Sequence, residues 1–439
     1  MKINFDNMDV ASLAFSYVRT LMVAGTGGAD IGECLLVAQN TKKNDIESWI
    51  REWAIAAEKV ARKAEQAMQA GQLVTAREAY MRASNYYRAA MFYLAPTDVR
   101  LNAYIALSRE HFRKAAALFT SPRIEVVDIP FGDARLPAYF LSSGNSKRPT
   151  LIAVNGGDST NEELIHWYGF AAVARGWNFF VFEGPGQWSA LQMNPGLYLR
   201  PDYEVPVKTI VDYLVQREEV DSDSIALIGP SMGAVLAARV AAFEKRISAY
   251  IFNGLVIDVN EAWTATMPAL LRNAPPSIFD RIFTLVEKIS PELRGLANHF
   301  RWMFGVSTPT EMFAAWPRFS VKGLAPKIQS PVLLMYGEGE FKETSEKVIM
   351  SVLEFINEFT CPAWIHIFQS KDGWAASHCQ VGALHEAQAV IFDWLDATLK
   401  NKNHATNTNS PTTIWNIINK YHRTNKMLKL QESIRIKEF

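Results

Sequence analysis

A serine lies between two glycines in the segment Gly229-Pro230-Ser231-Met232-Gly233, directly after a short apolar run and directly before an alanine-rich helical stretch. Where a strand turns this sharply into a helix, the nucleophile is strained, and side chains two residues before and after it would collide. Glycine occupies both of those positions here. The pattern predicts Ser231 as a covalent nucleophile, but small residues also occur in ordinary loops, so the prediction depends on finding a base and an acid.

A serine hydroxyl becomes a good nucleophile when an imidazole takes its proton, and a carboxylate must hold that imidazole in the correct tautomer. On a strand-turn-helix scaffold of this kind the order along the chain is serine, acid, histidine. Of the eight histidines, His378 alone follows the last expected strand in a loop, just before the final amphipathic helix. We expect His378 to be the general base. His366, within a strand, and His385, on a helix, fit structural roles better.

Two residues compete for the role of the acid. The acid normally follows the seventh strand, where this chain has Glu340. An aspartate is more usual there, and the longer glutamate reaches the same point only if its loop withdraws by about one methylene. Asp258, after the sixth strand, is the rival, and it could also cap a helix or face a substrate. Both acids remain open at this stage.

A tetrahedral oxyanion needs two N–H donors, one from the residue after the nucleophile and one from the loop after the third strand. Met232 would supply the first. The glycines of the tetrapeptide 155–158 (Asn-Gly-Gly-Asp) let the backbone approach a substrate, so we expect Gly157 to supply the second. Asp158 is the alternative donor and a candidate substrate-facing carboxylate. A pair of glycines after a strand is also a common turn.

The rest of the chain predicts an α/β fold that would position these residues. Residues 1–120 have helical periodicity, with a helix expected to start at Asn44 and Glu47. Eight short apolar segments then predict strands at 123–129, 135–142, 150–154, 178–182, 225–229, 248–253, 331–336 and 363–368. The first two predict a hairpin, and the later ones alternate with helices and predict a mainly parallel sheet. We divide the chain into a helical N-terminal domain (1–120), an α/β catalytic domain (121–400) and a polar C-terminal appendage (401–439), which is expected to be partly disordered.

About seventy residues separate the sixth and seventh strands, far more than an ordinary crossover needs. We expect residues 257–325 to form a lid. Its large apolar side chains could line a pocket over Ser231, or they could pack the lid onto the body. These side chains are Trp263, Met267, Phe279, Phe283, Trp302, Met303, Phe304 and Phe313.

Composition excludes several classes of partner. Basic and acidic residues balance at 45 each, so no whole-chain field favours nucleic acid or an anionic membrane surface, and a small-molecule substrate is more natural. No run of about 18 apolar residues and no signal-peptide pattern occurs, so no membrane span is expected. Cys34, Cys361 and Cys379 lack the spacing of a disulfide framework or a metal site. We therefore expect a cytoplasmic protein without a metal or cofactor.

With these residues placed, the chain resembles the fungal biosynthetic-cluster α/β-hydrolases typified by the yellowish-green heptaketide hydrolase and the fusarin-pathway hydrolase, which are related to bacterial 2,6-dihydroxypseudooxynicotine hydrolase. The resemblance covers about residues 10–400 and rests on several marks taken together. These are the tetrapeptide 155–158 with Glu162-Glu163, Gly184-Pro185-Gly186-Gln187, the pentapeptide 200–204, Gly229-Pro230-Ser231-Met232-Gly233, Asn253-Gly254 with Asp258 and Trp263, and His378-Cys379-Gln380. The chain departs from the pattern in two ways: Glu340 stands for an aspartate, and Glu183 with Trp188 replace the commoner Asp and Gly that flank Gly-Pro-Gly-Gln.

The resemblance implies a helical N-terminal region that packs on the lid side and helps to enclose the substrate, and proteins that often form homodimers. It also implies a polyketide-like substrate and one of two reactions. The first is hydrolytic carbon-carbon cleavage of a 1,3-dicarbonyl through an acyl-enzyme on Ser231. The alternative is a cyclase, a lactam-forming enzyme or an ester hydrolase that uses the same pocket. A binding protein that keeps the fold without catalysis is the third hypothesis.

Overall fold

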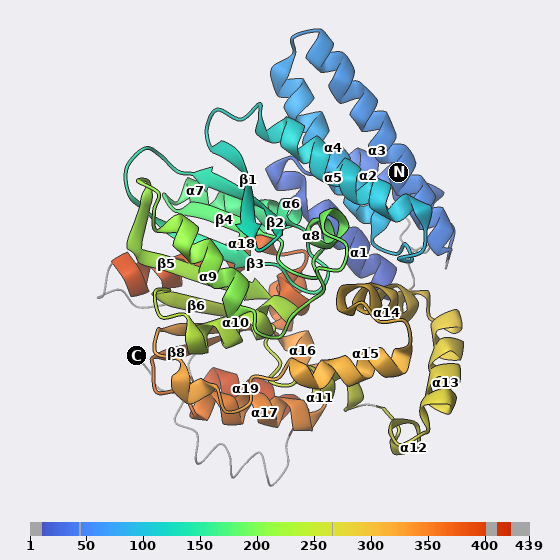
Figure 1. Ribbon diagram of the computed structural model, residues 1–439, viewed down its shortest axis with the longest axis vertical. Coiled ribbons are helices and arrows are strands. Elements are labelled where there is room, and N and C mark those ends of the chain that lie inside the picture. The colour runs from blue at the N-terminus through green and yellow to red at the C-terminus, as the bar shows by residue number, and fades with distance from the viewer. Residues whose placement is uncertain (1–10, 44, 266, 401–410, 423–439) are drawn as a thin grey trace.

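The computed structural model describes residues 11–43, 45–265, 267–400 and 411–422, and Figure 1 shows them as a central sheet with a helical region on one side. The helices before the sheet are α1 (Ala11–Leu21), α2 (Ile31–Asn40), α3 (Ile46–Gln69), α4 (Leu73–Met91) and α5 (Val99–Ala116). One face of α3 is apolar and buried, with Trp49 and Trp53 near its start. The cap of α3 is Asp45, whose carboxylate accepts the N–H of Ser48 at 3.0 Å. The expected cap, Asn44, lies outside the described residues.

The eight predicted strands are all present in one sheet, as the α/β prediction requires. They are β1 (Arg123–Phe131), β2 (Ala134–Ser142), β3 (Arg148–Val154), β4 (Asn178–Phe182), β5 (Val220–Pro230), β6 (Ala249–Asn253), β7 (Val332–Gly337) and β8 (Ala363–Phe368). Their spatial order is β1-β2-β4-β3-β5-β6-β7-β8. Strand β2 is antiparallel to β1 and β4, and the remaining pairs are parallel. All the carboxyl ends of the parallel strands therefore meet at one edge of the sheet.

Each face of the sheet has its own apolar core. Successive residues along β5 belong to different cores, because successive side chains of a strand point to opposite faces. Leu227 and Ile228 are an example. One core continues without a break into the helices α1 to α5 and α18 (Leu384–Leu395). The other lies under α9 (Glu204–Leu214), α10 (Met232–Phe243) and α17 (Glu346–Asn357). The helical region is thus packed on the sheet through a shared core. Shorter helices on the body are α6 (Asn161–Leu164), α7 (Phe170–Ala174), α8 (Trp188–Met193) and α16 (Glu338–Glu343).

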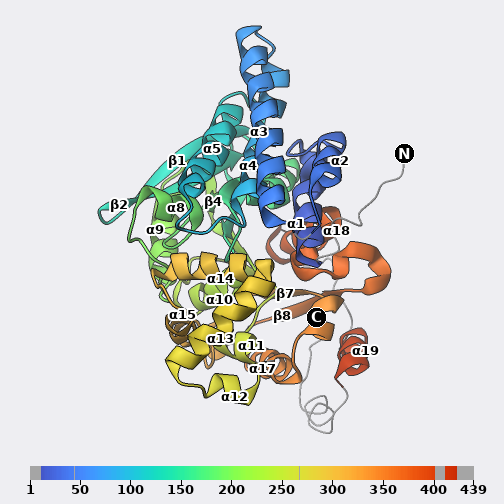
Figure 2. The same cartoon turned by 90° about the vertical axis from the view of Figure 1, so that its right-hand side faces the viewer.

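The segment between β6 and β7 forms a separate layer of helices next to the N-terminal region (Figures 1 and 2). These helices are α11 (Val259–Thr264), α12 (Ala269–Arg272), α13 (Pro276–Ile289), α14 (Pro291–Phe304) and α15 (Pro309–Ala315). Their aromatic rings contact one another: Trp263 stacks on Trp316 with ring centroids 5.7 Å apart, and Phe279 lies 5.3 Å from Phe313. Most of the expected pocket-lining residues therefore hold the lid together.

A helix near the C-terminus corrects one expectation. Residues 411–421, assigned to a polar appendage, form α19 (Pro411–Tyr421), which buries Ile414, Trp415, Ile417 and Ile418 against the body. Its end also holds α16, because Lys420 and Tyr421 both donate to Oε1 of Glu338, at 2.7 and 2.8 Å. His422 donates to the carbonyl oxygen of Phe341 at 2.6 Å.

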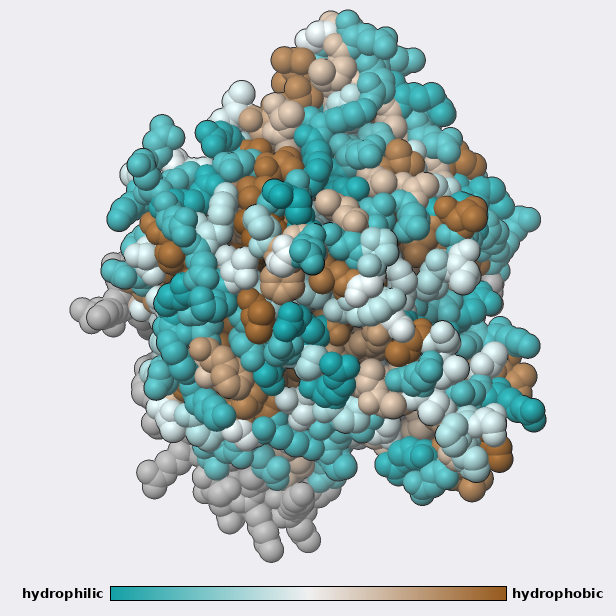
Figure 3. Space-filling model, in the orientation of Figure 1, coloured by the Kyte–Doolittle hydropathy of each residue, from teal (hydrophilic) through white to brown (hydrophobic). Residues whose placement is uncertain are grey.

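The outer surface is mixed in character. On the face drawn in Figure 3, hydrophobic side chains lie in scattered areas among polar ones. No helix in the described part of the chain is long and apolar enough to cross a membrane.

We predict that Ile418→Asp releases α19, because the new carboxylate would be buried without a partner. Hydrogen exchange followed by mass spectrometry should show faster exchange across residues 411–421. Asn416→Asp, on the exposed side of the same helix, is the matched control and should leave exchange unchanged. Equal exchange in both variants would contradict the docking of α19.

Candidate active site

Ser231 occupies a strained turn between β5 and α10. Its backbone has φ 56° and ψ −125°, a region that residues other than glycine rarely adopt. A Cβ atom at Gly229 would overlap the carbonyl oxygen of Gly233, and one at Gly233 would lie 2.7 Å from the carbonyl oxygen of Val154. The N–H of Ser231 donates to the carbonyl oxygen of Asn253, at the end of β6, at 2.7 Å. The turn is therefore locked between β3, β5 and β6.

His378 and Glu340 meet at the same edge of the sheet. Nδ1 of His378 donates to Oε1 of Glu340 at 2.6 Å, and Oε2 of Glu340 accepts the N–H of Gly337 at 2.7 Å. Desolvation of the ring lowers the pKa of His378, but the neighbouring Cys379 sulfur and the Glu340 carboxylate more than offset this and raise it well above its usual value. We attribute the upward direction chiefly to Glu340, which holds a direct hydrogen bond to the ring.

Ser231 and His378 line one small cavity of about 50 Å³. No hydrogen bond joins the two side chains among the described contacts. Nε2 of His378 lies 3.5 Å from Sγ of Cys379, the next residue, which is buried and has φ 52°. Phe15 and Trp167, from α1 and the segment after α6, also line the cavity, whereas none of the eight lid residues named above does. The helical region contributes to the enclosure, and the lid aromatics expected over Ser231 do not reach this cavity.

Asp258 lies elsewhere in the structure. Its carboxylate caps α11 by accepting the N–H of Glu261 at 2.9 Å, and Nζ of Lys322 lies 3.5 Å from it. The contacts of Asp258 are those of a helix cap, and the carboxylate bonded to the histidine is that of Glu340.

The loop after β3 approaches the nucleophile closely. A Cβ atom at Gly156 would lie 3.6 Å from Cβ of Ser231, and one at Gly157 would lie 3.6 Å from Cβ of Met232. Met232 is the first residue of α10, where backbone N–H groups have no partner within the helix. Both predicted donors, Gly157 and Met232, therefore lie on segments that border Ser231, and their N–H groups have no acceptor among the described contacts.

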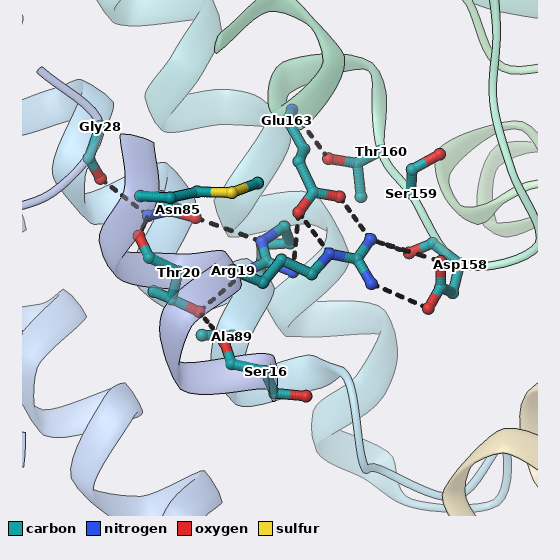
Figure 4. A network of polar contacts seen from close by, with 12 residues as sticks. Ser16, Arg19, Thr20, Gly28, Asn85, Ala89, Asp158, Ser159, Thr160 and Glu163 are labelled. Atoms are coloured by element: carbon teal, nitrogen blue, oxygen red, sulfur yellow. Dashed lines mark hydrogen bonds and ion pairs between the residues drawn. The ribbon is translucent and has the colours of Figure 1, made fainter. Parts of the chain in front are cut away.

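An arginine from α1 ties this loop to the helical region (Figure 4). Arg19 is 4% exposed and makes a bidentate pair with Glu163, at 2.7 and 2.6 Å, while Nη1 donates to Asp158 at 2.8 Å. Nη1 of Arg88, on α4, lies 3.3 Å from Glu163. Burial raises the pKa of Asp158, but the charge of Arg19 outweighs it and lowers the pKa below its usual value, so Asp158 is ionised at neutral pH. The positive charges of Arg19 and Arg88 therefore balance the negative charges of Asp158 and Glu163.

The lid holds the same loop from the other side. His299, on α14, donates from Nε2 to the carbonyl oxygen of Gly157 at 2.5 Å, and the indole of Trp188 donates to the carbonyl oxygen of Asp158 at 3.0 Å. The two rings stack with centroids 4.0 Å apart. Burial lowers the pKa of His299 to about 4, so the ring is neutral at pH 7. The loop is thus held by the lid at Gly157 and by α8 at Asp158.

Glu183 explains how Trp188 is placed. Its buried carboxylate accepts the N–H groups of Asn161, Ser189 and Ala190, which fixes the first turn of α8. Burial, with the nearby Glu162 charge adding to it, raises the pKa of Glu183 to about 7. Sequence reasoning noted Glu183 and Trp188 as departures but did not find Arg19, Arg88 or His299. Arg19, Arg88 and His299 contact residues far away in the sequence, so no local sequence pattern indicates their role.

Comparisons with known proteins identify the family. Hydrolase acrC of Aspergillus aculeatus is 30% identical over 422 residues, covering 88% of this chain and 96% of that protein. The 20-hydroxy-prefusarin hydrolase FUS2 of Gibberella moniliformis is 30% identical over 410 residues with the same coverage, and alpha/beta hydrolase pydG of an Acremonium species is 32% identical over 411 residues. The chain belongs to the fungal biosynthetic-cluster α/β-hydrolases.

This membership confirms the resemblance, and the protein is an enzyme of the α/β-hydrolase class. No family model matches the chain. The crystal structure of 2,6-dihydroxy-pseudo-oxynicotine hydrolase superposes with a TM-score of 0.68 at 22% identity and covers 88% of this chain and 98% of its own. At that identity the similarity shows that this α/β-hydrolase shares the fold.

We predict that Glu340→Gln lowers the pKa of His378, because the charge that favours the imidazolium is removed while the side-chain shape is kept. The pH titration of the ring, followed by NMR on histidine-labelled protein, measures the shift. Asp258→Asn should leave the titration unchanged. If the second variant moved the His378 titration and the first did not, Asp258 would be the acid.

Arg19→Met should lower the free energy of unfolding by about 3–5 kcal/mol, because it leaves buried carboxylates with one cation fewer. Urea denaturation measures this. The double variant Arg19→Met/Glu163→Gln should recover part of the loss, since it removes one uncompensated charge. Arg62→Met, which removes an exposed pair with Glu58, is the control and should change stability by about 0–1 kcal/mol. No recovery in the double variant would argue against charge balance as the cause.

Proposed function

We propose that this α/β-hydrolase uses Ser231, His378 and Glu340 to cleave a carbon-carbon bond in a 1,3-dicarbonyl of a polyketide-like secondary metabolite. The observation that carries the proposal is the 2.6 Å bond between Glu340 and His378 beside the cavity that Ser231 lines. An unused site has no need for a strained nucleophile, an oriented base and two free N–H donors together.

The first half-reaction forms an acyl-enzyme. Oγ of Ser231 attacks a ketone carbon and its proton passes to Nε2 of His378, which must turn from the Cys379 sulfur toward Ser231 when substrate binds. Such catalytic hydrogen bonds often tighten only in the complex. The N–H groups of Met232 and Gly157 stabilise the oxyanion. The carbon-carbon bond then breaks, and the second carbonyl delocalises the electron pair as an enolate, which takes the proton from His378.

The second half-reaction consumes one water. His378 accepts a proton from the water, which attacks the acyl carbon. The Ser231 ester bond then breaks, Oγ takes the proton back from His378, and a carboxylic acid is released. Glu340 keeps Nδ1 protonated and stabilises the imidazolium in both halves. The two products together weigh one water more than the substrate.

The polyketide-like substrate class is supported by the relatives, one of which is named for its action on 20-hydroxy-prefusarin. Asp158, ionised and lining the Ser231 cavity, is the candidate for binding a polar substrate group, although Arg19 already occupies both of its oxygens. The proposal includes a cytoplasmic homodimer, an expectation that rests on the cysteine pattern and the resemblance.

We predict that the wild-type protein, incubated with a β-diketone polyketide, yields two fragments whose summed mass exceeds the substrate by one water. Mass spectrometry should also detect an acyl adduct on Ser231. Ser231→Ala should form neither. A product equal in mass to the substrate, or lighter by one water, would show cyclisation instead. Turnover by Ser231→Ala at the wild-type rate would rule out the serine mechanism.

A further inference from the structure

The cavity beside Ser231 is too small for the proposed substrate. Its volume of about 50 Å³ holds one or two water molecules, whereas pockets for small molecules span about 300–1,000 Å³. The atoms of a polyketide remote from the cleaved bond must therefore lie outside this cavity.

A groove of about 590 Å³ lies where the helical region, α8 and the lid meet. Its lining combines apolar and polar side chains, including Asn102, Leu191, Tyr198, Arg301, Trp302 and Val306. The groove has the volume of a ligand site, and its mixture of rings, amides and a guanidinium suits a long chain that carries oxygen atoms along an apolar backbone.

A stack of His299 on Trp188, with Trp302 tilted against both rings, links the lining of the groove to the loop beside Ser231. Trp302 lines the groove, and its ring centroid lies 6.0 Å from that of His299 and 5.7 Å from that of Trp188. On the opposite side of the stack, His299 and Trp188 bond the carbonyl oxygens of Gly157 and Asp158. Asp158 lines the Ser231 cavity. The three rings therefore connect the groove to the loop that borders the Ser231 cavity.

We infer that this groove binds the part of the substrate remote from the cleaved bond, an elongated and partly oxygenated chain, and that Trp302, His299 and Trp188 form the wall that the chain must pass to reach Ser231. The inference rests on the proposed function and adds the location and chemical class of the remote binding site. Binding energy gained in the groove would orient the reacting carbonyl at Ser231.

The test compares two fluorophosphonates, one with an ethyl chain and one with a decyl chain. With either probe, Oγ of Ser231 forms a bond to phosphorus, the phosphorus–fluorine bond breaks, fluoride leaves and His378 takes the serine proton. Intact-protein mass spectrometry gives the labelling rate. The decyl chain offers the groove a long apolar tail that the ethyl chain lacks.

Asn102→Trp and Val306→Trp fill the groove from opposite walls. Each should slow decyl labelling about tenfold, the effect of losing roughly two buried methylenes, and leave ethyl labelling within about twofold. Ala103→Trp is the matched control, because residue 103 is exposed on α5 like residue 102 but does not line the groove. It should label with both probes at the wild-type rates. Because residue 102 is exposed, Asn102→Trp should fold normally. It therefore still tests the groove if Val306→Trp fails to fold.

Trp302→Ala thins the wall and should raise the ratio of decyl to ethyl labelling. A decyl-to-ethyl ratio that stays the same in all four variants would overturn the inference and leave the serine mechanism intact. Absence of a Ser231 adduct with both probes in the wild-type protein would instead overturn the proposed function, so the two failures are distinguishable.

Discussion

The strained backbone of Ser231 is the constraint on which the rest of the site depends. A residue held at this φ and ψ costs about 1–3 kcal/mol, and the surrounding packing must over-determine it. Here the compensation comes from the bond to the carbonyl oxygen of Asn253 and from glycines that admit no side chain. Asn253 also donates from Nδ2 to the side chain of Gln380 at 2.9 Å, two residues after His378. One strand end therefore fixes both the nucleophile and the loop that carries the base.

The oxyanion loop adds a second dependence, because it is held from outside the sheet. Arg19 binds Asp158 and Glu163 from the helical region, while His299 and Trp188 bind the backbone carbonyls of the loop. These contacts restrict the backbone of the loop that carries the N–H of Gly157. Because the helical region and one face of the sheet have a common core, a shift of α1 relative to the sheet would move these donors. The N-terminal helices thus act on the geometry of the site as well as on its enclosure.

The sequence predicts the parts of this enzyme that follow local rules. Every strand was predicted to within a few residues, except that β5 begins earlier, because buried parallel strands are continuous apolar runs between turn residues. The order serine, acid, histidine follows from topology and locates Glu340. Arg19 could not be found this way, since its partner Glu163 lies 144 residues away. The apolar positions of α19 were visible at helical spacing, but the surrounding Asn and Lys residues favoured an appendage, and only burial against the body shows that the helix docks.

The glutamate in place of the usual aspartate has a geometric explanation. Glu340 is the third residue of α16, and its Oε2 turns back to the N–H of Gly337 while Oε1 reaches His378. Turning back toward its own helix start takes up the additional methylene. The strand end at Gly337 approaches the histidine loop closely because glycine has no Cβ atom. A Cβ atom at this position would overlap the carbonyl oxygen of Ala376. Glu340 is therefore held at the start of α16, and α19 binds the same helix end through Glu338. The position of the imidazole consequently depends on a chain of contacts that extends to the C-terminal helix.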